Sequence, residues 1–150
     1  MRFAFLRHDQ TLVGTLIKWW TKAQYSHCEI LFGDELMFSA HPKDGTGYRT
    51  LGFKDQCNWD YLDLPTSLIE DDRIKCFCEA ELGCSYDWKG IWLSQIIRMS
   101  RASKGQWFCS EFCTAAAQQV GRLQTCRACD VSPGHLYKRL KESGATPCDP

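Results

Sequence analysis

The stretch YSHCEILFGDELMFSA, residues 25–40, contains two apolar runs separated by Gly33 and Asp34. Two short apolar runs joined by a glycine-containing turn are typical of a β-hairpin. Residues 2–6, 47–53 and 59–64 have a similar strand-like pattern. Because consecutive strands with short connections pair antiparallel, this part of the chain predicts an antiparallel sheet of about four to five strands.

Helical patterns dominate the second half of the chain. Apolar side chains at helical spacing predict helices over residues 11–23, 65–82, 88–98 and 109–120. Ser132 as N-cap and Pro133 at the first helical position predict a final helix that ends before Gly144. Since strands come first and most helices later, we expect an α+β fold in which the sheet packs against helices. No repeat or linker divides the 150 residues, which predicts a single domain over 1–150.

Charge and hydropathy exclude several classes of protein. The 18 basic and 18 acidic side chains cancel, and neither sign forms a long block, which argues against nucleic-acid binding. No run approaches the roughly 20 apolar residues of a membrane helix, so we expect no integral membrane segment. The start of the chain, MRFAFLRHDQ, lacks the pattern of a signal peptide, which indicates a cytoplasmic protein.

Ten cysteines are a high count for this length. Without a signal peptide we expect them to be reduced, and most to be small buried apolar side chains. The segment CRAC, Cys126 to Cys129, is a C-x-x-C pair, but no second pair accompanies it to complete the four ligands of structural zinc. A zinc-stabilised domain is therefore an alternative, and the prediction is a protein with no metal and no cofactor.

Cys109 is the candidate nucleophile. It lies in the first turn of the predicted helix 109–120, on the apolar stripe that faces the sheet. Free N–H groups and the positive end of the helix dipole there lower the pKa of a thiol and can stabilise an oxyanion. Core packing is the alternative for Cys109, and it is the prediction for Cys113, one turn further into the helix.

His27 is the candidate base. It begins the apolar strand, and Glu29 shares its side of the strand because side chains alternate. A carboxylate there could orient the imidazole, as in nucleophile–base–orienter sets. The alternative is that both residues mark the solvated face of an edge strand. The other histidines, His8, His41 in a loop and His135 in the last helix, are predicted to be structural or exposed.

Four motifs in order carry a family resemblance: SHCEI followed by a hairpin, GCSYDWKG (83–90), WFCSEF, and DVSPGHL (130–136). Over residues 24–137 the chain resembles the circularly permuted NlpC-type papain-like cysteine hydrolases, the branch of YiiX-like and lecithin:retinol-acyltransferase-like proteins. The resemblance implies a permuted papain-like fold and a catalytic pair of His27 and Cys109. It also implies a bacterial or viral (phage) thiol hydrolase acting without metal on peptide amides, cell-wall peptides, or acyl esters of small molecules and lipids.

The chain departs from this pattern at one position. YiiX-like members often carry a glutamate on the strand after the histidine strand, where this sequence has Ser39 in LMFSA. We therefore expect Glu29 to orient His27, with Ser39 as the alternative. Glu111, beside the helix start, is assigned a structural role.

The aromatic residues Tyr25, Trp19, Trp20 and Trp107 are candidates to line a cleft, although core packing is the alternative for them. The function expected from the sequence is a thiol-dependent hydrolase. The alternative is a non-catalytic papain-like binding or accessory protein of viral or bacterial origin.

Overall fold

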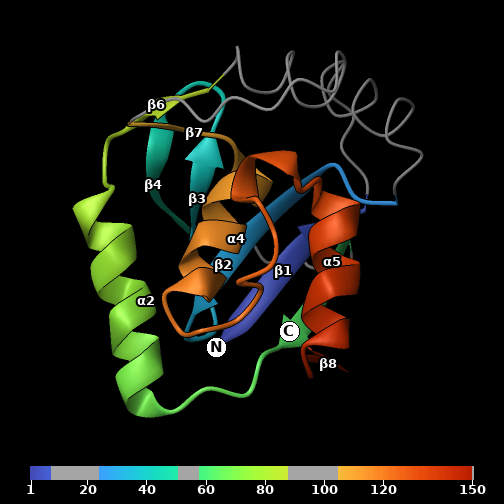
Figure 1. Cartoon of the computed structure of the whole chain (residues 1–150). Helices are drawn as coiled ribbons and strands as arrows, with labels where there is room; N and C mark the ends of the chain where they lie inside the picture. The colour runs from blue at the N-terminus through green and yellow to red at the C-terminus, as the bar shows by residue number, and fades with distance from the viewer. Residues whose placement is uncertain (8–23, 51–57, 88–104, 150) are drawn as a thin grey trace.

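A six-stranded antiparallel sheet forms the centre of the structure, a computed structural model that describes residues 1–7, 24–50, 58–87 and 105–149 (Figure 1). In spatial order the strands are β4 (Gly45–Thr50), β3 (Leu36–His41), β2 (His27–Phe32), β1 (Arg2–Leu6), β5 (Trp59–Asp63) and β8 (Thr146–Cys148). The predicted α+β class with an antiparallel sheet is confirmed. The sheet has one strand more than expected, because the short edge strand β8 contains Pro147, a residue that obscures a strand pattern.

The hairpin of β2 and β3 sets the register of the sheet centre. Ile30 pairs with Phe38 and Phe32 with Leu36, so the turn contains three residues, 33–35, and begins with Gly33 at a positive φ of 68°. The predicted turn at Gly33 and Asp34 was thus one residue too short. Three-residue hairpin loops need one residue in the left-handed region, where glycine is favoured.

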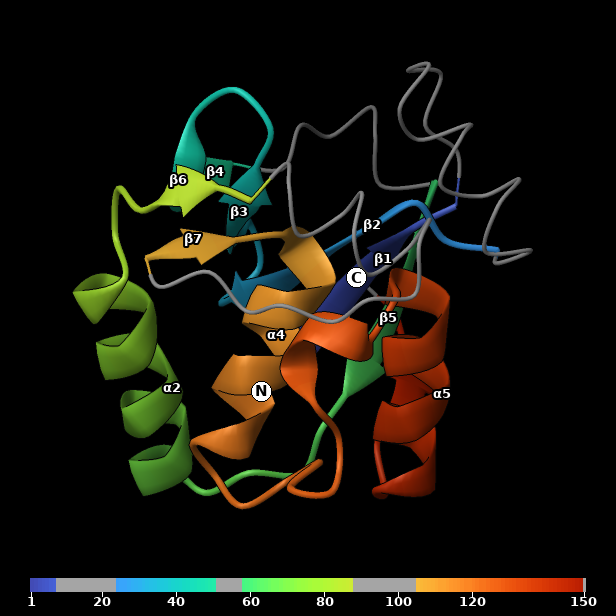
Figure 2. The ribbon, with the colours of Figure 1, turned by 45° about the horizontal axis from the view of Figure 1, so that its top comes forward.

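The described part of the chain contains three α-helices, and they lie on one face of the sheet (Figures 1 and 2). They are α2 (Leu68–Ala80), α4 (Cys109–Gln118) and α5 (Pro133–Glu142), with a short 3-10 helix, η3 (Ala128–Asp130), before α5. The N-cap Ser132 accepts a hydrogen bond from the main-chain N–H of His135, so the predicted start of α5 is confirmed. Helix α2 begins later than predicted because Ser67 is its N-cap and forms a capping box with Glu70.

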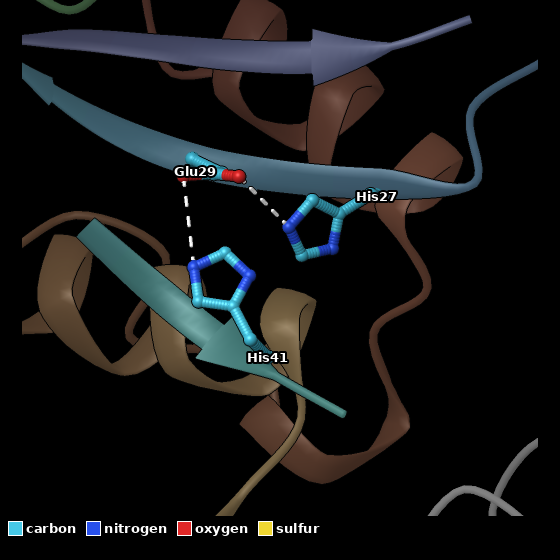
Figure 3. Close-up of side chains that lie close together, drawn as sticks. All are labelled: His27, Glu29 and His41. Atoms are coloured by element: carbon cyan, nitrogen blue, oxygen red, sulfur yellow. Dashed lines mark hydrogen bonds and ion pairs between the residues drawn. The ribbon is translucent and has the colours of Figure 1, made fainter. Parts of the chain in front are cut away.

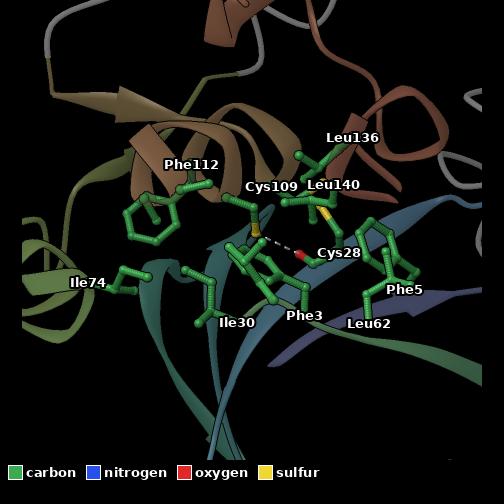
Figure 4. Packing of buried hydrophobic residues seen from close by; sticks show 14 of the residues in the cluster. Phe3, Phe5, Cys28, Ile30, Leu62, Ile74, Cys109, Phe112, Leu136 and Leu140 are labelled. Atoms are coloured by element: carbon green, nitrogen blue, oxygen red, sulfur yellow. Dashed lines mark hydrogen bonds between the residues drawn. The ribbon is translucent and has the colours of Figure 1, made fainter. Parts of the chain in front are cut away.

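The main core lies between the sheet and these helices (Figure 4). Its largest fully buried side chains come from four strands, the residue after β5 and all three helices: Phe3, Phe5, Ile30, Phe38, Leu62, Leu64, Ile74, Phe112, Leu136 and Leu140. A smaller cluster lies on the opposite face of the sheet and consists of Ala4, Leu31, Met37, Trp59 and Tyr61. Both faces of β2 are therefore packed, and its side chains alternate between the two clusters.

A short parallel pair of strands, β6 (Ser85–Tyr86) and β7 (Gln106–Trp107), positions the start of α4. The main-chain N–H of Asp87 donates to the carbonyl of Trp107 at 2.9 Å, and Thr46 of β4 donates its N–H to the carbonyl of Cys84 at the same distance. These bonds tie the segment before α4 to the β3–β4 end of the sheet. Cys109 lies two residues after Trp107, the last residue of β7. Its position therefore depends on the pairing of β7 as well as on its own helix.

Several predictions lie outside the described residues. They are the helix over 11–23 with Trp19 and Trp20, the helix over 88–98, the end of the strand over 47–53, and His8. Among the helices of the described ranges, none has the length and apolar character required to cross a membrane.

Candidate functional site

Cys109 is the first residue of α4, after the extended N-cap Phe108. The side chain of Phe108 makes no capping hydrogen bond, and the side chain of Cys109 is buried with 4 % relative exposure. The first turn of a helix has main-chain N–H groups without intrahelical acceptors, and these favour an anion. The predicted position of Cys109 in the first turn, facing the sheet, is confirmed.

The sulfur of Cys109 lies at the start of β2. Its neighbours there are the thiol and main-chain N–H of Cys28 and the imidazole of His27, and all three act on the pKa of Cys109. The thiol of Cys28 contributes most to a pKa of Cys109 well below the usual value; burial opposes this effect, and the charge and hydrogen bond of His27 reinforce it. Cys109 is therefore favoured as the thiolate.

His27 is the first residue of β2 and is partly buried. Burial by itself would lower the pKa of the imidazole, but the neighbouring Cys109 sulfur and the hydrogen bond to Glu29 outweigh it and raise the pKa well above the usual value. The pKa values of the two partners move in opposite directions. This is the electrostatic signature of a thiolate–imidazolium pair.

Glu29 contacts the far side of the His27 ring. Its Oε1 is 3.1 Å from Nε2 of His27, and its Oε2 is 3.9 Å from Nε2 of His41 (Figure 3). The carboxylate is buried with 4 % relative exposure. The structure thus brings together the three residues that the sequence singled out, Cys109, His27 and Glu29. The alternative of a solvated edge for His27 and Glu29 is wrong, because β2 is a central strand and Glu29 is buried.

His41 corrects the sequence-based interpretation. It was placed in a loop, but it is the last residue of β3, is 3 % exposed, and lies with its ring centroid 5.4 Å from that of His27. The register of the β2–β3 hairpin explains this, since Ile30 opposite Phe38 puts positions 27 and 41 opposite each other on one face. Burial lowers the pKa of His41 to about 4, so its ring is neutral at pH 7.

Ser39 and Cys113 both form hydrogen bonds to one carbonyl. The hydroxyl of Ser39 donates to the carbonyl of Cys28 at 2.8 Å, and the thiol of Cys113 donates to the same oxygen at 3.7 Å. Both residues are buried. The prediction that Cys113 belongs to the core is confirmed. Ser39 supports the strand that carries His27, whereas the carboxylate bonded to the imidazole comes from Glu29.

Glu111 is buried beside another carboxyl group. Burial, and then the nearby charge of Asp87, raise its pKa to about 7, although a hydrogen bond from the main-chain N–H of Phe108 opposes both. Asp87 is itself 1 % exposed. Because Glu111 accepts the N–H of the N-cap residue, its contact is with the helix start, which agrees with the structural role predicted for it.

Two of the predicted cleft residues have structural contacts instead. Tyr25 is buried, donates its hydroxyl to Asp60 at 2.7 Å and packs against Phe5, so the alternative of core packing is confirmed for it. Trp107 is partly buried and donates its indole N–H to Glu81 at 2.8 Å.

Tyr86 is a further neighbour of the thiol that sequence reasoning did not assign. Burial and then the charge of Cys109 raise the pKa of its phenol well above the usual value. In the structure Tyr86 lies in β6 and pairs with Trp107, in the segment before α4. The sequence signal for it was its place in the GCSYDWKG motif.

The nine cysteines of the described residues are all free, and five of them are buried. In the C-x-x-C pair, Cys129 is buried and Cys126 is partly buried. Within the described ranges, metal-ligating side chains gather in a group of three at His27, Glu29 and His41, and the C-x-x-C pair is not part of such a group.

One surface pocket lies beside Asp63 and Asp71, and another lies beside Phe77 and Gln119. Neither is lined by Cys109 or His27. The chain matches no protein-family model, and no curated protein is significantly similar to it.

Proposed function

We propose that the protein is a thiol-dependent hydrolase in which Cys109 attacks an amide or ester carbonyl and His27 is the general acid and base. The observation that carries this proposal is the placement of the Cys109 thiol, at the start of α4, beside the His27 imidazole, where each group shifts the pKa of the other toward a thiolate–imidazolium pair. A nucleophile in contact with a base that a third group orients is the arrangement that covalent acyl transfer requires.

Each step uses a group at the site. Glu29 occupies Nε2 of His27, which leaves Nδ1 for the proton of the thiol. The thiolate adds to the carbonyl carbon, and N–H groups of the uncapped first turn of α4 offer hydrogen bonds to the oxyanion. The imidazolium then protonates the leaving amine or alcohol. Water, deprotonated by His27, adds to the acyl-enzyme, and the acid leaves as the thiolate re-forms.

The substrate class follows from this chemistry. A peptide amide, a cell-wall peptide, an acyl ester and a thioester all present a carbonyl carbon to the same pair. We favour an amide, as expected from the resemblance described above, with acyl or lipid esters as the second class. No step in this scheme requires a metal or an organic cofactor.

Site-specific alkylation tests the proposal. At pH 6 an ordinary thiol is ionised to roughly one part in a thousand, so a thiolate stabilised by His27 should react with iodoacetamide at least about tenfold faster. Mass spectrometry of each cysteine-containing peptide gives the individual rates. We expect Cys109 to react first and to lose that preference in His27→Ala. Cys113→Ser is the matched control, one helical turn away, and should leave the rate at Cys109 unchanged.

Hydrolysis is then measured with chromogenic amide, ester and thioester substrates. Cys109→Ser and His27→Ala should each abolish turnover of whichever substrate is cleaved. Equal, slow alkylation of all cysteines would contradict the proposal.

One observation favours a second function, a papain-like binding protein without catalysis. The side chain of Cys109 is only 4 % exposed. Fast alkylation of Cys109 without turnover of any carbonyl substrate would support this second function.

A further inference from the structure

We propose that Nε2 of His27, a carboxylate oxygen of Glu29 and Nε2 of His41 form a binding site for a divalent transition metal ion, with zinc as the best fit, and that metal bound there blocks the thiol chemistry. The binding site stands on its own observations. The inhibitory effect rests on the proposed function of His27.

Among the residues that the structure describes, two buried polar atoms of this cluster lack a hydrogen-bond partner. They are Oε2 of Glu29 and Nε2 of His41, on side chains with 5 % and 4 % relative exposure. They point toward each other across 3.9 Å (Figure 3). Buried polar atoms without a partner are destabilising, and a group of this kind indicates a missing ligand. A cation between them would satisfy both.

The donor set matches zinc. The three ligand atoms lie within 4.8 Å of one another, and the pair His27–Glu29 is separated by 3.1 Å. Two ligands of a tetrahedral zinc ion lie about 3.3 Å apart when each bond is about 2.0–2.1 Å long, so a modest contraction would close the site. Two imidazoles and one carboxylate form a common zinc ligand set that leaves a fourth position for water.

The charge around the cluster also favours a cation. Glu29 is a buried carboxylate, and among the described residues its ion-pair partners are His27 and His41, with no lysine or arginine. The side chain of His27 retains 16 % relative exposure, which gives the cluster one edge open to solvent. A metal ion can therefore reach a site whose other two ligands are buried.

Metal binding would change what His27 can do. Coordination uses the lone pair of Nε2, so the remaining ring proton resides on Nδ1, the nitrogen left for Cys109. A ring in that state has no lone pair to accept a proton from the thiol or from water. The metal also displaces the Glu29 hydrogen bond that holds the imidazole. The reaction of Cys109 should therefore stop while the metal is bound.

Binding is tested in Cys109→Ser, a protein that cannot perform the thiol reaction. After chelation and removal of the chelator, zinc is titrated by calorimetry, and cobalt is used to detect thiolate ligands by their charge-transfer absorption. We expect one ion per chain without a thiolate band. His41→Ala should weaken binding at least about a hundredfold, because even the loss of a group that supports a ligand costs 10–100-fold. His135→Ala, at an exposed histidine of α5, is the matched control.

The unsubstituted chain provides a second measurement in case His41→Ala does not fold. In protein labelled with 15N at the imidazoles, zinc should shift the Nε2 resonances of His27 and His41 and leave His135 in place. A strong thiolate band, equal binding by His41→Ala, or the absence of both heat and resonance shifts would overturn the metal site.

Alkylation of Cys109 tests the inhibitory effect. In the unsubstituted chain, zinc should slow alkylation of Cys109 at least about tenfold relative to the rate in chelator. In His41→Ala, the rates in zinc and in chelator should be equal. Equal slowing in both would mean that zinc binds Cys109 directly, which overturns the inhibitory effect. Slow alkylation of Cys109 in the unsubstituted chain with chelator would count against the proposed hydrolase. It would not count against the metal site, because metal binding is measured in Cys109→Ser.

Discussion

Replacement of Glu111 by glutamine should change how the stability of the protein depends on pH. The carboxyl group is buried, and its pKa is raised from 4.5 to about 7 by burial and by the charge of Asp87. A shift of about 2.5 units corresponds to about 3 kcal/mol, at 1.36 kcal/mol per unit. The folded state therefore prefers the protonated carboxyl group by this amount.

The sign of the effect follows from the raised pKa. The contribution of Glu111 to stability is fully present below pH 4.5, where the group is protonated in both states, and it is lost as the pH rises through about 7. Glutamine carries no charge and can still accept the N–H of Phe108. The free energy of unfolding of Glu111→Gln should thus equal that of the parent near pH 4.5 and exceed it by about 3 kcal/mol at pH 8.

Urea unfolding followed by tryptophan fluorescence at several pH values measures both proteins. The quantity of interest is the difference between them, because all other titrating groups are common to the two. Glu142→Gln is the control, at a half-exposed carboxylate of α5 that pairs with Arg139, and should change stability by less than about 1 kcal/mol at any pH. Parallel curves for Glu111→Gln and the parent between pH 4.5 and 8 would refute the reasoning.

Three further predictions test other contacts. Cys28→Ala removes the largest cause of the low pKa of Cys109, so the thiolate absorbance and alkylation rate of Cys109 at pH 6 should fall; unchanged values would count against that hydrogen bond. Ser132→Ala removes the N-cap of α5 and should cost about 1 kcal/mol in urea unfolding, and a neutral effect would disprove the cap. Gly45→Ala should cost more than Gly33→Ala in the same assay. Both residues have positive φ, but only at Gly45 would a Cβ overlap a main-chain carbonyl, so equal losses would contradict this geometry.

The elements of the fold could be predicted from local patterns. The apolar runs around Gly33 predict the β2–β3 hairpin, and Ser132 with Pro133 predicts the start of α5, because turn and cap residues act on their own neighbours in the chain. The first-turn position of Cys109 and the shared side of His27 and Glu29 follow from the periods of helix and strand. The sequence of β8 does not predict a strand, because β8 is stabilised by its pairing with β5 and not by a strand pattern of its own.

The sequence by itself determined the residue types available for chemistry and the local face on which each lies. Only the tertiary structure decided which of them meet. A turn of two residues would pair position 27 with 40 and put His41 on the other face of the sheet, whereas the observed three-residue turn puts His41 beside Glu29. Likewise, the contact of Cys109 with His27 and Cys28 depends on how α4 packs on β2, through interactions between segments far apart in the chain that no local pattern encodes.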